Sequence, residues 1–446
     1  MPRPLPPKLR AVLYAMRGGF LVRPLAIVLA LGSLGALLSE LEERFPAVRA
    51  LVPGALFPSK DDPQVAQAIL SVVATSTMTV VSIVFAVLLM TLTLASTQFS
   101  PRILVGFARD RVTQWTLGVF LGAFCYCIAA LPAARALPSP FSPVVTVLGA
   151  MALAPICVGM LIYFIHHISN AISVNNIVDR IRRDTERVID DLSPAPSRPI
   201  EPPEAEGVFP AELSVAVMSQ SSGYIRFVDI ERLRELAKEY GVSMRLERRV
   251  GHFIPRGVPL LKLTRGLHIT PDRAERLLSA IEIGPTRTLE QDVEFGVVQI
   301  VDIALRAISP AVNDPTTAIS CVDQLSCILI RRLGRAPPQS YYYDPPQLLR
   351  LAVPWIDLNG LLDLAFEQIR HYAVADAAVS LRLMRALGDI ASVATDPAMG
   401  RMLTARGQQL LDGCAGKLQN GDFERLRRRF ALLEAGRAQE DRVGGL

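Results

Sequence analysis

Residues 65–97 read VAQAILSVVATSTMTVVSIVFAVLLMTLTLAST, and this stretch decides the fold. It contains 33 residues and no charge, proline or glycine. A bilayer core is spanned by about 20 such residues, whereas water gives no reason to keep a helix uncharged for so long. As one helix the stretch would be roughly 50 Å long at about 1.5 Å per residue. We therefore expect it to tilt within a membrane or to project beyond it.

Hydroxyl side chains recur along this stretch at spacings close to multiples of the helical turn. They are Ser71, Thr75, Thr79, Ser82, Thr93 and Ser96. The spacing predicts one polar stripe on an otherwise apolar helix. Two interpretations stay open, because such a stripe either lines a route for ions or small solutes or lets transmembrane helices pack closely.

Three further apolar runs indicate transmembrane helices. They cover about residues 20–38, 113–131 and 143–165. The first run is long for the apolar part of a signal peptide and is followed by more spans, so we expect a retained helix. Together the four runs predict a transmembrane domain over residues 1–168.

Basic residues alternate with the predicted spans. The N-terminus, the loop at 98–111 and the segment after the fourth span carry several arginines, whereas the other two loops are net acidic or nearly uncharged. By the positive-inside rule we expect both termini in the cytoplasm. The net charge of +5 thus suits contact with a lipid bilayer, and we expect no nucleic-acid partner.

The chain changes character after the fourth span. Residues 169–192 predict an amphipathic helix that leaves the membrane, and the proline-rich run 193–210 predicts an extended linker. Residues 211–268 predict a small β-rich subdomain that includes a hairpin at 252–263. Residues 269–446 predict a helical subdomain. The expected fold class is therefore a membrane domain of four transmembrane helices plus a cytosolic α+β domain, with its β-rich part first.

The densest polar pattern lies at residues 286–319, TRTLEQDVEFGVVQIVDIALRAISPAVNDPTTAI. Thr288 and Gln291 predict a capping box, and Asp314 predicts the cap of the next helix. Helix caps and side-chain pairs account for the pattern without a ligand. The alternative is a polar pocket for an ion or small molecule where two helix ends meet. Its residues would be Asp292, Gln299, Asp302, Arg306, Asn313, Asp314 and Thr316.

The chain resembles a bacterial family of predicted multi-pass inner-membrane proteins that carry a domain of unknown function. The resemblance rests on the FSPR motif at 99–102, on the glycine and aromatic spacing at 117–124, and above all on the run 288–318. It implies an inner-membrane protein with a cytosolic C-terminal domain, and it brings no established activity.

The sequence contains none of the common catalytic fingerprints. A phosphate-binding loop, a zinc-protease helix, a nucleophile elbow and a dinucleotide-binding glycine pattern are all missing, and the six cysteines form no C-x-x-C pair. We expect no catalytic site, no metal and no cofactor. The leading functional prediction is an oligomeric channel or transport-type protein that its cytosolic domain regulates. The alternative is a membrane-anchored ligand-sensing or scaffolding module without conduction.

Overall fold

The computed structural model describes residues 22–45, 62–98, 110–135, 140–171, 173–193, 209, 211–264 and 270–443. The chain divides into two compact units, Met1–Ser173 and Val174–Leu446. The FSPR motif at 99–102 and nearly all of the run predicted as a linker, 193–210, lie outside the described residues.

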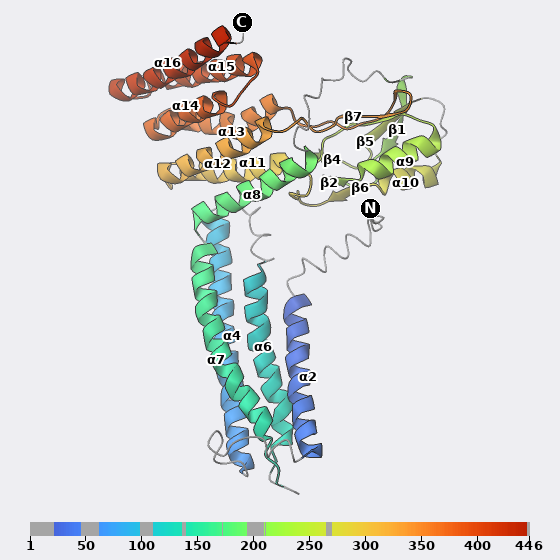
Figure 1. Cartoon of the computed structure of the whole chain (residues 1–446), viewed down its shortest axis with the longest axis vertical. Helices are drawn as coiled ribbons and strands as arrows, with labels where there is room; N and C mark the ends of the chain where they lie inside the picture. Colours follow the sequence, from blue (N-terminus) through green and yellow to red (C-terminus); the bar gives the residue numbers. More distant parts are fainter. Residues whose placement is uncertain are drawn as a thin grey trace. The chain divides into compact units, whose positions relative to one another are not determined.

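Four long apolar helices form the described part of the first unit (Figure 1). They are α2 (Val22–Arg44), α4 (Pro63–Gln98), α6 (Arg111–Ala130) and α7 (Val144–Ala171), with the short 3-10 helix η2 (Leu131–Ala133) after α6. Each of the four is long and apolar enough to cross a membrane, which confirms the four predicted apolar helices. Helix α4 continues for 36 residues without interruption. Its length of about 54 Å exceeds a hydrocarbon core of about 30 Å.

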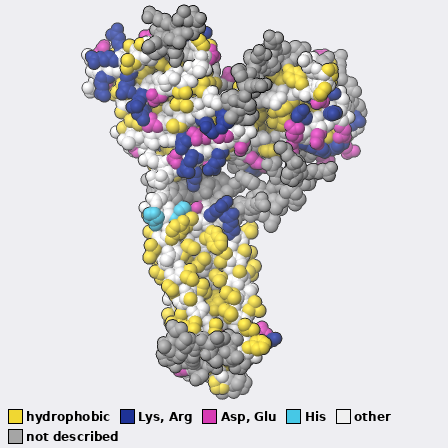
Figure 2. All heavy atoms as spheres, in the orientation of Figure 1, with side chains coloured by type: hydrophobic (Ala, Val, Ile, Leu, Met, Phe, Trp, Pro, Cys, Tyr) yellow, Lys and Arg dark blue, Asp and Glu magenta, His cyan; other side chains and the backbone are white. Residues whose placement is uncertain are grey.

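Apolar side chains cover the visible face of these helices, and charged side chains gather mainly on the second unit (Figure 2). Glycines bring α2 and α6 close together. A Cβ atom added at Gly35 would lie 2.5 Å from the carbonyl oxygen of Tyr126, and one added at Gly122 would lie 2.6 Å from the side chain of Leu31. Close packing of this kind holds helices together in a bilayer, where lipid tails are as apolar as the side chains and the hydrophobic effect between helices is lost.

A buried carboxylate joins α2 to the start of α7. Glu42 is 1% exposed and accepts hydrogen bonds from the backbone N–H groups of Val145, at 2.8 Å, and Thr146, at 3.0 Å. The hydroxyl of Thr146 donates to the same carboxylate. Because the first N–H groups of a helix have no partner within it, Glu42 caps α7 from a neighbouring helix.

The second unit begins with α8 (Val174–Leu192), which packs on helices α11 and α12. A β-part follows, with strands in two sheets of order β1-β5-β3-β8-β7 and β4-β2-β6. The strands are β1 (Leu213–Met218), β2 (Gly223–Val228), β3 (Met244–Leu246), β4 (Phe253–Ile254), β5 (Pro259–Thr264), β6 (Ile281–Gly284), β7 (Tyr341–Asp344) and β8 (Leu348–Ala352). Three of them, β6, β7 and β8, follow residue 268, within the range that the sequence assigns to helices.

The predicted hairpin at 252–263 is wrong. Strand β4 pairs with β2, and β5 pairs with β1 and β3. The expected turn is present, with Gly257 at φ +82°, but it carries the chain from one sheet into the other. A local turn pattern identifies where the chain bends and leaves open which strand the next segment joins.

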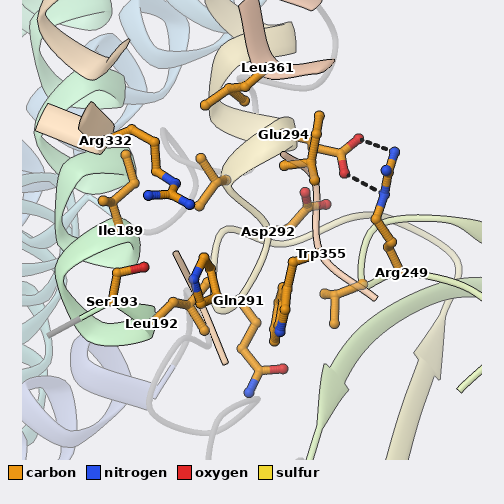
Figure 3. A pocket seen from close by; sticks show the side chains of 14 residues that line it. Ile189, Leu192, Ser193, Arg249, Gln291, Asp292, Glu294, Arg332, Trp355 and Leu361 are labelled. Carbon is orange, nitrogen blue, oxygen red and sulfur yellow. Dashed lines mark hydrogen bonds and ion pairs between the residues drawn. The ribbon is translucent and has the colours of Figure 1, made fainter. Parts of the chain in front are cut away.

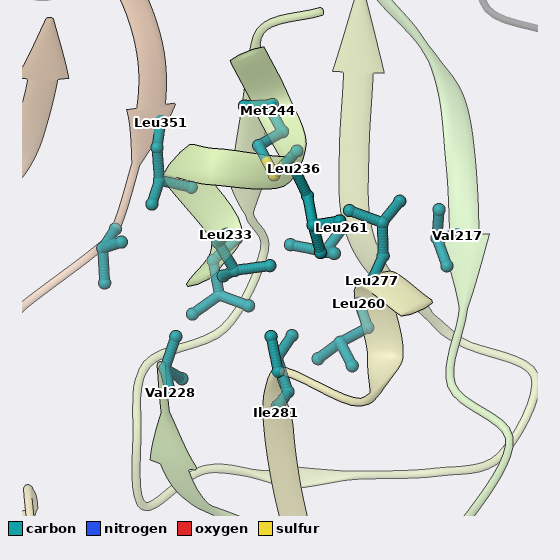
Figure 4. Close-up of a cluster of buried hydrophobic side chains, with 14 of the residues drawn as sticks. Val217, Val228, Leu233, Leu236, Met244, Leu260, Leu261, Leu277, Ile281 and Leu351 are labelled. Atoms are coloured by element: carbon teal, nitrogen blue, oxygen red, sulfur yellow. The ribbon is translucent and has the colours of Figure 1, made fainter. Parts of the chain in front are cut away.

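Helices α9 (Ile230–Tyr240) and α10 (Pro271–Leu278) contribute to the core of this β-part. Leu233 and Leu236 of α9 and Leu277 of α10 are completely buried beside strand residues such as Leu261 (Figure 4). Burying each such side chain stabilises the fold by about 1.5–3 kcal/mol.

The remaining helices pack against one another in succession (Figure 1). They are α11 (Val293–Ala307), α12 (Pro315–Leu333), α13 (Leu358–Ala373), α14 (Ala377–Ala391), α15 (Pro397–Cys414) and α16 (Asn420–Val443). The predicted succession of a small β-part and a helical part is confirmed.

Candidate functional site

Four hydroxyl side chains of α4 line a groove between α4 and α6. Ser71, Thr75, Thr79 and Ser82 are exposed and border a cavity of about 440 Å³. The opposite wall is largely apolar and comes from α6 and η2. It consists of Phe124, Cys127, Ile128 and Leu131. Thr93 is exposed elsewhere on α4, and the side chain of Ser96 lies outside the described residues.

Three hydroxyl groups of the stripe bond to carbonyl oxygens of their own helix. The hydroxyl of Thr79 donates to the carbonyl oxygen of Thr75 at 2.9 Å, and that of Ser82 donates to the carbonyl of Met78 at 3.2 Å. Thr93 bonds in the same way to Leu89, at 2.8 Å. These three donors are therefore satisfied without any external partner, while their oxygen lone pairs remain able to accept.

A second polar centre surrounds Asp292, the N-cap of α11. This carboxylate is 2% exposed, accepts from the backbone N–H of Phe295 at 3.0 Å, and receives both Nε and Nη2 of Arg287, at 2.7 and 2.8 Å. A Cβ atom at Gly251, where φ is +88°, would lie 2.2 Å from Oδ2 of Asp292, so only glycine fits there. Burial raises the pKa of Asp292, and the ion pair with Arg287 opposes that shift.

The predicted capping box of Thr288 and Gln291 is wrong. Helix α11 begins at Val293 with Asp292 as its cap. Gln291 instead bonds to the backbone of Val228 in β2, accepting from its N–H at 2.9 Å and donating to its carbonyl at 3.2 Å. The side chain that would close a capping box thus attaches the start of α11 to the sheet.

A small pocket of about 30 Å³ lies against the start of α11 (Figure 3). Its polar lining comes from several elements and includes Ser193, Arg249, Gln291, Asp292, Glu294 and Arg332. Arg249 forms an ion pair with Glu294 at 3.0 Å. Burial raises the pKa of Glu294, and Arg249 opposes that shift.

The seven residues predicted for the polar pocket do not surround one site. Asp292 lies at the start of α11 and Arg306 near its end, about 21 Å apart at about 1.5 Å per residue. Asp302 and Arg306 are half-buried. Gln299 is 6% exposed, and its Oε1 has no hydrogen-bond partner among the residues that the structure describes.

The other three lie at the turn between α11 and α12. Asn313 adopts a left-handed conformation with φ +50°, Asp314 caps α12 through the N–H of Thr317 at 3.1 Å, and Thr316 is exposed. The cap predicted at Asp314 is confirmed. The structure thus brings Asn313, Asp314 and Thr316 together and places Asp292 at the opposite end of α11.

Sequence reasoning missed the role of Gly296. A Cβ atom at this position would lie 1.8 Å from Oγ1 of Thr185, so the glycine lets α8 and α11 cross at very short range. The signal was present in the sequence as a glycine within an otherwise apolar helical pattern. Arg332 and Ser193, which also line the pocket at the start of α11, gave no comparable signal.

Metal-binding side chains do not gather in the part of the chain that the structure describes: no group of three or more His, Cys, Asp or Glu is placed to hold an ion. His167 lies 3.1 Å from the carboxylate of Asp110, which caps α6. This pair ties the end of α7 to the start of α6.

Comparison with known proteins identifies a family of predicted membrane proteins. The family described as predicted membrane protein (DUF2254) matches residues 17–389. The uncharacterized proteins Mb1321c of Mycobacterium bovis and Rv1290c of Mycobacterium tuberculosis are each 33% identical over 399 residues, which cover 87% of this chain and 74% of the relative. No solved structure matches. Helices α15 and α16 lie beyond the residues that the family matches.

Proposed function

We propose that this chain, which belongs to the DUF2254 family of predicted membrane proteins, conducts ions or small solutes through an oligomer. The family is one of membrane proteins without an established activity, so conduction is a step beyond it. One observation carries this step: four exposed hydroxyl side chains of α4, Ser71, Thr75, Thr79 and Ser82, border a groove of about 440 Å³.

The chemistry of the groove suits a partly dehydrated cation. Thr79 and Ser82 give their protons to carbonyl oxygens of α4, so their own oxygens offer lone pairs to the groove. Neutral oxygens of this kind can replace water around a cation. Helix α4 carries no Asp, Glu, Lys or Arg, which favours passive conduction over a proton-driven carrier.

An oligomer is part of the proposal because a single groove has only two walls. A polar route through hydrocarbon must be enclosed, and the groove is open on the face away from α4 and α6. A second copy would bring a chemically identical stripe to that face by rotational symmetry. We also place the protein in the bacterial inner membrane with both termini cytoplasmic, on the support of the arginine distribution. A fluorescent protein fused to the C-terminus should therefore fluoresce, and an alkaline phosphatase fusion there should be inactive.

Liposomes test conduction directly. The purified full-length protein, reconstituted into vesicles loaded with potassium chloride, should release potassium faster than protein-free vesicles. A combined Thr75→Val, Thr79→Val and Ser82→Ala variant should lose this flux. Thr93→Val is the matched control, because its hydroxyl bonds to the same helix outside the groove. Absence of flux, or equal flux from the combined variant, would reject the proposal.

A second candidate function is a membrane-anchored module that senses a ligand or scaffolds partners without conduction. The polar pocket at the start of α11 favours it. The liposome measurement separates the two candidates, since a sensing module alone gives no flux.

A further inference from the structure

Arg332 is a half-buried cation for which no carboxylate partner lies among the described residues. It belongs to the last turn of α12, and its Nη1 donates to the carbonyl oxygens of Arg335 at 3.1 Å and Ala336 at 3.3 Å. Its neighbours Arg331 and Arg335 share the carboxylate of Asp190, at 2.5 and 2.9 Å. Burial lowers the pKa of Arg332, and no acidic side chain counteracts that shift.

The pocket beside Arg332 also contains a hydroxyl group without a partner. Ser193 is 1% exposed, and its Oγ makes no hydrogen bond to any other described group. In Figure 3 the guanidinium of Arg332 and the hydroxyl of Ser193 lie on the same side of the pocket, away from Arg249. Buried polar groups in native structures have partners as a rule, so the hydroxyl of Ser193, which has none among the described groups, indicates an occupant.

The two carboxylates that line the pocket already have basic partners. Arg249 is paired with Glu294, and Arg287 is paired with Asp292. Arg332 is therefore the lining cation without an acidic partner among the described residues. Water would satisfy hydrogen bonds without neutralising that charge, whereas an anion does both.

We propose that this pocket binds one small monovalent anion, of the size of chloride, between the guanidinium of Arg332 and the hydroxyl of Ser193. The volume of about 30 Å³ sets the size, because a single water needs about 10–15 Å³ of such space. Both groups offer N–H or O–H donors, which is the complement that an anion requires. The site lies within the second unit and does not depend on the proposed conduction.

Thermal unfolding of the full-length protein in detergent tests the site. The unfolding temperature should be higher in sodium chloride than in sodium gluconate at equal ionic strength, because an ion that binds the folded state stabilises it. The variant Arg332→Gln should raise the chloride concentration for half-maximal stabilisation by at least about tenfold, since it removes a charged donor. Ser193→Ala should raise it by a smaller factor. Arg331→Gln is the matched control, because it lies on the same turn and is paired with Asp190.

Bromide provides a second measurement that does not depend on a variant. Crystals grown in sodium bromide should show an anomalous peak within hydrogen-bond distance of Arg332 and Ser193. Equal unfolding temperatures in chloride and gluconate, or the absence of the bromide peak, would mean that the pocket holds water and would overturn the proposal. Chloride dependence that persists unchanged in Arg332→Gln would overturn it as well. If Arg332→Gln does not fold, the chloride dependence of Ser193→Ala and the bromide peak in the unchanged protein still test whether an anion binds.

Discussion

Replacing Gly296 by alanine should force α8 away from α11. The added Cβ atom would lie 1.8 Å from Oγ1 of Thr185 and 2.9 Å from its Cβ. Thr185 is completely buried, and its hydroxyl donates to the carbonyl oxygen of Ile181 at 2.7 Å. The Cγ2 atom of Thr185 is also only 3.0 Å from the added atom, so moving the hydroxyl alone does not relieve the clash and the two helices must separate.

The magnitude follows from two opposing terms. Overpacking a buried contact costs about 1–3 kcal/mol, and a clash this severe belongs at the upper end, about 3 kcal/mol. Alanine also stabilises the helix by about 1 kcal/mol relative to glycine, because its helix propensity is higher. The net loss of about 2 kcal/mol should lower the unfolding temperature of this unit by about 4–8 °C. Circular dichroism of the purified full-length protein in detergent measures it.

Two further variants make the result interpretable. A Cβ atom at Gly388 in α14 meets nothing within 4 Å, so Gly388→Ala should leave the unfolding temperature unchanged or raise it. Adding Thr185→Ala to Gly296→Ala removes the closest atom and should restore most of the loss. If Gly296→Ala unfolded at the same temperature as Gly388→Ala, the close crossing of α8 and α11 would be refuted.

Three other predictions concern the remaining contacts. Glu42→Ala should lower the unfolding temperature in detergent, because the start of α7 loses buried acceptors at a cost of about 1–3 kcal/mol. Glu43→Ala, which removes an exposed ion pair, should change it little, and equal effects would contradict the cap. Gly35→Ala should loosen the packing of α2 on α6 and accelerate proteolysis, whereas Gly159→Ala, with open space around it, should not. Hydrogen bonding to Arg331 holds the pKa of Asp190 below its usual value. The stabilising contribution of this ion pair is therefore complete above the usual pKa of an aspartate and is lost as the pH falls through the lowered pKa. The difference in unfolding temperature between Asp190→Asn and the unchanged protein should therefore become smaller as the pH is lowered. A difference that does not depend on pH would count against this ion pair.

Features set by neighbouring residues could be predicted from the sequence. The four apolar helices follow from composition alone, because a long uncharged run is stable only where hydrocarbon or protein replaces water. The helix at 230–240 is equally local, since Asp229 caps its start and Gly241, at φ +67°, ends it.

Features that depend on distant partners could not be predicted in this way. Strand β8 pairs in parallel with β3, and nothing in the residues around Leu351 indicates Met244 as its neighbour. Gln291 has the right spacing for a capping box, but its side chain instead forms hydrogen bonds with the backbone of Val228 in β2, which is far away in the sequence. The seven residues predicted for the polar pocket at 286–319 lie apart for a related reason. Helical spacing puts residues on one face of α11 but does not bring the two ends of this helix together.

The internal hydrogen bonds of α4 determine how the conduction experiment should be interpreted. Because Thr79 and Ser82 bond to their own helix, removing their hydroxyls leaves no unpaired partner on another helix. The combined groove variant should therefore fold with nearly unchanged stability, and valine keeps the branched shape of threonine. Loss of flux at an unchanged unfolding temperature would then report on the route itself. Loss of both flux and stability would instead mean that the stripe packs against another helix, which is the other role of such residues in membranes.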